Sequence, residues 1–144
     1  MAITQALPNS FKKQLLDGDQ DFSSAGGDKF KLALYVSTAT LGASTTSYTT
    51  SGEVSSSGTG YTTGGKALVN SGTSVVSTVA FTDFADLSFT SVTLTARGCL
   101  IYNTSFSNSA VAVLNFGADK TATSGTFTIQ FPAFTSSAAI IRIS

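Results

Sequence analysis

The chain has 144 residues, zero formal net charge at pH 7, no histidine, no tryptophan and one cysteine. This charge balance excludes the basic field that a nucleic-acid or anionic-membrane binder needs, and a hydrophobic content of 42% with 11 phenylalanines excludes intrinsic disorder. Serine and threonine fill 44 positions while charged residues make up 11%, so hydroxyl groups cover the surface and the β propensity of threonine indicates an all-β chain.

The N-terminal residues predict the one helix of the chain. Asn9 or Ser10 can cap it, Leu7, Phe11 and Leu15 then lie on one face, and Gly18 ends it. A helix of about two turns must dock to persist in water. We therefore expect residues 1–18 to form a helical arm that packs on its own sheet or on a neighbouring subunit, with Phe11 and Leu15 as the anchors.

The rest of the chain has the two-residue period of strands, broken by turn residues. A Ser/Thr/Gly-rich loop region spans 37–65, in which we expect brief strands near Tyr48 and Val54. The predicted strands are 29–37, 66–70, 75–82, 91–97, 99–102, 111–116, 126–131 and 139–143. About eight short strands with close turns predict a single all-β domain, an antiparallel β-sandwich or jelly-roll, over 1–144.

Motifs for metal or phosphate binding are incomplete. Asp17, Asp19 and Asp21 alternate as in a calcium loop, but Phe22 and Asp28 stand where such a loop needs glycine and glutamate. The glycine-rich stretch 58–66 matches neither phosphate-binding spacing. Without histidine, a nucleophilic hydroxyl also lacks its usual base. We expect no metal, no cofactor and no enzymatic activity.

Three further features are interpreted structurally. Cys99 stands in an apolar run, which is typical of a packing thiol rather than a reactive one. Arg97 and Arg142 stand on predicted strands among apolar residues, where a guanidinium needs a partner. We expect ion pairs with Asp83, Asp86 or a neighbouring subunit, although Asp83 and Asp86 also suit turn capping.

The order of several sequence blocks resembles a family of small virion structural proteins of tailed bacteriophages. The similarity extends over nearly the whole chain, and the blocks are MAITQALPNSFKKQLLDG, FKLALYVSTATLGASTTSYTTSGEV, GTGYTTGGKAL, FADLSFTSVTLTARGCLIYN, AVAVLNFG and FTIQFPAFTSSAAIIRIS. None of these blocks is a catalytic or ligand motif. The resemblance implies a structural protein of the particle, in head decoration or in tail attachment, and assigns no functional residue.

Together these observations predict a capsid decoration or cement protein, made in the host cytoplasm without a signal peptide and placed on the capsid exterior of the virion. Its expected partners are the major capsid protein and copies of itself, as a homo-oligomer such as a trimer. Expected lattice or subunit contacts are Phe11, Leu15, Tyr48 and Tyr61. One alternative is a tail protein of the tube, baseplate or fibre. Another is a carbohydrate-binding adhesin that stacks sugars on Tyr35, Tyr48, Tyr61 or Tyr102.

Overall fold

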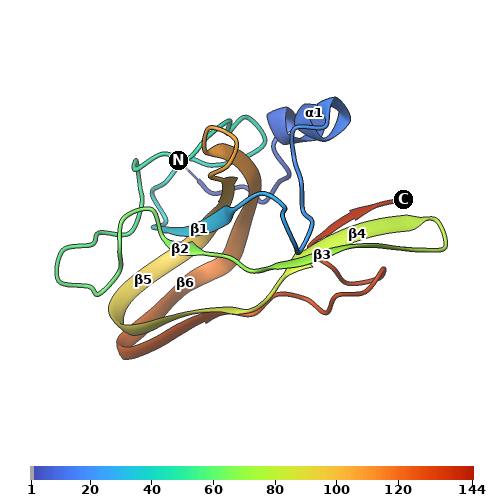
Figure 1. Ribbon diagram of the computed structural model, residues 1–144. Coiled ribbons are helices and arrows are strands. Elements are labelled where there is room, and N and C mark those ends of the chain that lie inside the picture. The colour runs from blue at the N-terminus through green and yellow to red at the C-terminus, as the bar shows by residue number, and fades with distance from the viewer. Residues whose placement is uncertain (1) are drawn as a thin grey trace.

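The computed structural model describes residues 2–144 and contains one short helix and two antiparallel sheets (Figure 1). One sheet has the strand order β2-β1-β5-β6 and the other β3-β4-β7. The elements are α1 (Asn9–Asp17), β1 (Phe30–Tyr35), β2 (Lys66–Ala67), β3 (Asn70–Val76), β4 (Val79–Phe84), β5 (Leu87–Asn103), β6 (Ser109–Ile129) and β7 (Ile141–Ile143). The all-β fold with a short N-terminal helix, predicted from composition and periodicity, is confirmed.

The main core contains residues of both sheets and is rich in phenylalanine. Phe22 stacks on Phe30 with ring centroids 4.7 Å apart, and Phe84 of the second sheet meets both rings edge-on. Such aromatic contacts add to the hydrophobic burial of the rings. Strand β1 is buried on both faces, with Phe30, Leu32 and Leu34 on one face and Ala33 and Tyr35 on the other.

The N-terminal arm covers that second face. Ile3 packs there, and Ala6 and Val113 exchange two main-chain hydrogen bonds of 3.0 and 2.9 Å at the outer edge of β6. Helix α1 follows Pro8, which takes the cap position without a side-chain hydrogen bond, and it ends at Gly18 in the left-handed conformation. The predicted helix and its C-terminus are confirmed, whereas Asn9 and Ser10 lie inside the helix.

Strands β5 and β6 form a long bent hairpin of 17 and 21 residues (Figure 1). The sequence predicts two strands in each of these segments, because Gly98 and the polar stretch 117–125 look like breaks. The two strands instead stay paired along their length, with register shifts between Phe89 and Val92 and between Ala96 and Gly98. Bulges of this kind bend a hairpin without ending it.

The segment predicted as one strand over 75–82 is a tight hairpin. Val76 pairs with Val79, and Ser77 at the turn has φ +54°, a left-handed conformation that the apolar alternation of the sequence does not reveal. The brief strands expected near Tyr48 and Val54 are not formed. Their places are taken by isolated bridges, Ser47 with Ser109 and Glu53 with Tyr35. No helix among residues 2–144 has the length and apolar character needed to cross a membrane.

Candidate interaction surfaces

The single glutamate of the chain joins separate parts of the loop 37–65. Glu53 Oε1 accepts hydrogen bonds from the Tyr61 hydroxyl and the Gly64 amide, both at 2.7 Å, and Oε2 accepts one from the Tyr48 hydroxyl at 2.6 Å. Hydrogen bonds to a charged acceptor are shorter and stronger than neutral ones. Glu53 therefore joins three points of a loop that has almost no regular structure.

All four tyrosines of the chain belong to this arrangement, which we call the tyrosine cluster (Tyr35, Tyr48, Tyr61, Tyr102 and Glu53). Tyr35 donates to the Thr49 carbonyl and Tyr102 to the Gly64 carbonyl, each at 2.6 Å, while Tyr48 stacks on Tyr102. Burial, reinforced by the nearby Glu53 carboxylate, raises the pKa of Tyr102 to about 12 and also raises the pKa of the other three phenols.

The tyrosine cluster corrects two expectations. Tyr61 is only 3% exposed and its hydroxyl oxygen also accepts the Leu34 amide proton, so it is a core residue and not a lattice contact. Tyr35 and Tyr102 are equally buried, and Tyr48 is half-buried with its hydroxyl turned to Glu53. The chain therefore offers no open tyrosine ring for a sugar to stack on.

The two predicted helix anchors, Phe11 and Leu15, differ in how far they are buried. Phe11 is fully buried against Phe22, with ring centroids 6.0 Å apart, so the expected lattice contact at Phe11 is wrong and the arm packs on its own sheet. Leu15 is half-buried against the same core. Leu16, which the sequence analysis does not single out, is 90% exposed. The 3.6-residue period of the helix predicts this exposure, because Leu16 lies outside the face that Phe11 and Leu15 form.

The expected ion pairs with Asp83 and Asp86 are not formed. Arg97 Nε instead contacts Asp119 Oδ1 at 2.8 Å, across the β5–β6 hairpin, and both side chains are partly exposed. Asp86 accepts the amide proton of Phe131 at 2.8 Å. Within residues 2–144, Arg142 makes no ion pair. Sequence alone cannot pair Arg97 with Asp119, because their contact depends on the bulged register of the hairpin.

Asp83 is a buried carboxylate with incomplete hydrogen bonding. Its Oδ1 accepts the Phe84 amide proton at 2.9 Å, while Oδ2 has no partner in the described part of the chain. Burial raises the pKa of Asp83 above its ordinary value of 3.8. This side chain lies at the base of the β3–β4 hairpin, and an ionised form is costly there.

The sheet β3-β4-β7, which we call the projecting sheet, extends away from the rest of the molecule (Figure 1). Val75, Ala80 and Ile143 are aligned across its three strands and therefore share one face. Val75 and Ile143 are exposed on this face. Val76, paired with Val79, is exposed on the opposite face, as is Phe134, which packs on Phe81. No charged residue occurs in 70–82. An apolar surface of this kind is typical of a contact with another protein.

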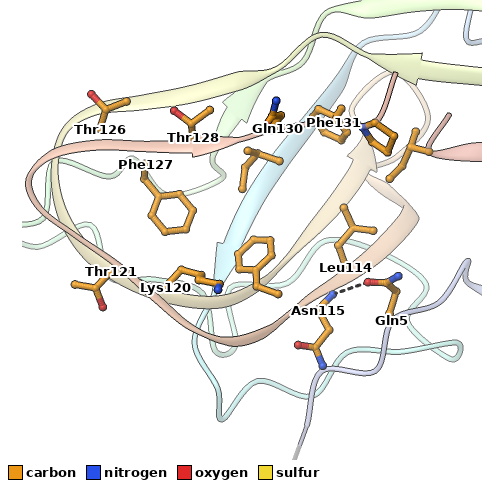
Figure 2. Close-up of a pocket in the computed structure, with 14 residues that line it drawn as sticks. Gln5, Leu114, Asn115, Lys120, Thr121, Thr126, Phe127, Thr128, Gln130 and Phe131 are labelled. Carbon is orange, nitrogen blue, oxygen red and sulfur yellow. Dashed lines mark hydrogen bonds between the residues drawn. The ribbon is translucent and has the colours of Figure 1, made fainter. Parts of the chain in front are cut away.

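A groove of about 580 Å³ lies inside the bend of β6, and we call it the β6 groove (Figure 2). Phe127 points into it, and Thr126 and Thr128 point to the other side of the strand. Phe116 meets Phe127 with ring centroids 6.1 Å apart. The lining consists of Gln5, Leu114, Asn115, Phe116, Lys120, Thr121, Pro132, Ile140 and residues 126–131.

The β6 groove offers shape and apolar surface but few reactive groups. Its lining contains one charged side chain, Lys120, and no carboxylate or thiol. Cys99 is fully buried elsewhere, and burial raises the pKa of its thiol, so the thiol stays protonated. Within residues 2–144, no three Asp, Glu or Cys side chains come together as metal ligands would.

Comparison of the chain with protein families, with curated proteins and with solved structures finds no match.

Proposed function

We propose that this protein is a non-enzymatic structural component of a bacteriophage particle, a decoration or cement protein that binds the outside of the capsid. The observation that carries the proposal is the projecting sheet, with exposed Val75, Val76 and Ile143 and no charge in 70–82. Burying apolar surface in a contact contributes about 25 cal/mol per Å² to the free energy of binding. The segment 70–82 contains no charged side chain whose burial would oppose this gain.

The sequence blocks that resemble phage structural proteins support the setting. The surface composition supports it as well, because a hydroxyl-rich surface with zero net charge packs against neighbouring subunits with little desolvation of charged groups. Binding that bridges capsid subunits stabilises the assembled shell over separated subunits. The proposed partners are the major capsid protein and further copies of this chain.

Cryo-electron microscopy of the particle tests the proposal directly. Density of this chain repeated over the icosahedral shell is the expected result, and density confined to the tail would support the tail alternative instead. A particle without this chain would contradict both readings.

A pair of variants then tests the surface. Val75→Asp is expected to lower occupancy on the shell by tenfold or more, since a charge buried at the contact is strongly unfavourable. Val69→Asp is the matched control, because Val69 and Val75 are both 66% exposed and Val69 lies outside the projecting sheet. Equal loss in both variants would remove the projecting sheet from the contact.

A further inference from the structure

Two features of the described residues 2–144 have no partner within the chain. The β3–β4 hairpin exposes Val75 and Val76 near its turn, and the β6 groove is a concavity whose lining is half apolar and half polar. The turn of the β3–β4 hairpin and the bend of the β5–β6 hairpin lie at opposite ends of the molecule (Figure 1). A chain therefore cannot place its own hairpin in its own groove, and a second copy can.

The groove runs along a free strand edge. β6 is the last strand in the order β2-β1-β5-β6, so one of its edges has no strand beside it. Consecutive residues from Thr126 to Pro132 all line the groove. The Thr126 and Thr128 side chains point to the other side of the strand, so these residues line the groove with their main chain, as at an open strand edge.

The same edge already accepts an extended segment within the chain. Ala6 exchanges two main-chain hydrogen bonds with Val113, and Gln5 Oε1 accepts the Asn115 amide proton at 3.1 Å. The N-terminal arm thus covers the first part of the β6 edge and stops where the groove begins. The remaining edge is suited to strand addition from outside.

The hairpin supplies a strand of the required kind. β3 is also an edge strand, and Asn70 at its start is held by the Ser23 and Asp28 carbonyls, which leaves Thr73–Val76 open. Natural edge strands are protected from pairing by charged residues or proline, and neither 73–76 nor 122–129 contains one. Lys120 is the one charged residue that lines the groove, so little charge is desolvated there when the two edges meet.

We propose that the β3–β4 hairpin of one copy docks in the β6 groove of a second copy. β3 adds to the free edge of β6. Because Val75 and Val76 point to opposite faces of β3, Val76 enters the groove and contacts Phe116 and Phe127, and Val75 lies on the side of Thr126. The contact joins two different surfaces, so repeated copies form rings or chains rather than a closed two-fold dimer. This inference rests on the proposed function and names one of its partners.

Cysteine cross-linking in solution tests the contact. Chains with Val75→Cys and chains with Thr126→Cys, distinguished by tag size, are mixed and treated with a short bismaleimide, to which the buried Cys99 does not respond. The expected product is the mixed dimer, with a yield about tenfold above that of Val69→Cys mixed with Thr126→Cys. Equal yields would overturn the proposal. Predominance of a Val75→Cys homodimer would also overturn it, in favour of a two-fold contact between hairpins.

A mixing experiment provides the second measurement. Val75→Asp disables the hairpin and leaves the groove intact, while Thr126→Lys blocks the edge and leaves the hairpin intact. Each variant alone is expected to sediment as a monomer at concentrations where the unmodified chain associates, and the mixture is expected to form a one-to-one dimer. A mixture that stays monomeric beside an associating unmodified chain would contradict the proposal.

The two proposals fail in different ways. An unmodified chain that stays monomeric and gives no cross-link above the Val69→Cys control would overturn the hairpin-in-groove contact. The function in the particle would still stand if density for this chain covers the capsid, with the projecting sheet bound to the capsid protein alone.

Discussion

The Tyr61 hydroxyl donates a hydrogen bond to Glu53 Oε1 at 2.7 Å and accepts one from the Leu34 amide at 3.0 Å. A single phenol therefore connects the loop 37–65 to the centre of β1. Tyr61 and Leu34 are both buried, so the hydrogen bond between them is shielded from water. Hydrogen bonds in such surroundings are costly to leave unmade.

Replacement of Glu53 by alanine is expected to destabilise the fold by about 2–4 kcal/mol, because the buried Tyr61 hydroxyl and the Gly64 amide both lose their acceptor. Urea unfolding measures the loss, and hydrogen exchange should show faster exchange in 37–65. Asp119→Ala is the matched control, since it removes a partly exposed carboxylate. A Glu53 variant as stable as the control would show that the tyrosine cluster does not fix the loop.

The tyrosines are expected to ionise only in strongly alkaline solution. Their ordinary pKa is about 10, and burial raises it in all four, to about 12 for Tyr102. Because the folded-state pKa is the higher one, the stabilisation is complete below about pH 10 and is lost as the pH rises through the folded-state values. Tyrosinate absorbance followed together with circular dichroism checks this. Ionisation near pH 10 in the folded protein would contradict the burial of the phenols.

Asp83 is expected to give the same direction of pH dependence in the acid range. Its folded-state pKa lies above 3.8, so its contribution to stability is greatest below that pH and is lost as the pH rises through the folded-state value. The stability of Asp83→Asn relative to the unmodified chain is therefore expected to increase between about pH 3 and pH 7. Thermal unfolding of both proteins at several pH values measures this. A difference that is constant with pH would contradict a raised pKa.

The ion pair between Arg97 and Asp119 is expected to contribute little. Both side chains are partly exposed, and such pairs typically contribute about 0.5 kcal/mol to the free energy of unfolding. Arg97→Ala should therefore leave the fold intact, and a double-mutant cycle with Asp119→Ala should give a coupling energy of that size. A coupling of several kcal/mol would show that this pair organises the hairpin.

Local pattern was sufficient to predict much of the fold. Alternation at Phe30, Leu32 and Leu34 specifies β1, and the spacing of Leu7, Phe11 and Leu15 before Gly18 specifies α1, because burial of one face follows directly from the period of the element. The hydroxyl-rich composition specifies the all-β class, because threonine favours strands. These properties depend on residues that are neighbours in sequence.

Long-range contacts decided the rest, including most of the candidate site residues. Whether Phe11 is buried or exposed depends on Phe22, and the partner of Arg97 depends on bulges that shift the β5–β6 register. The β6 groove exists because one strand bends while one of its edges stays unpaired. By itself the sequence determined the all-β class, the helix α1 and the strand β1. Only the tertiary structure decided which apolar side chains stay exposed, since that depends on what folds over them.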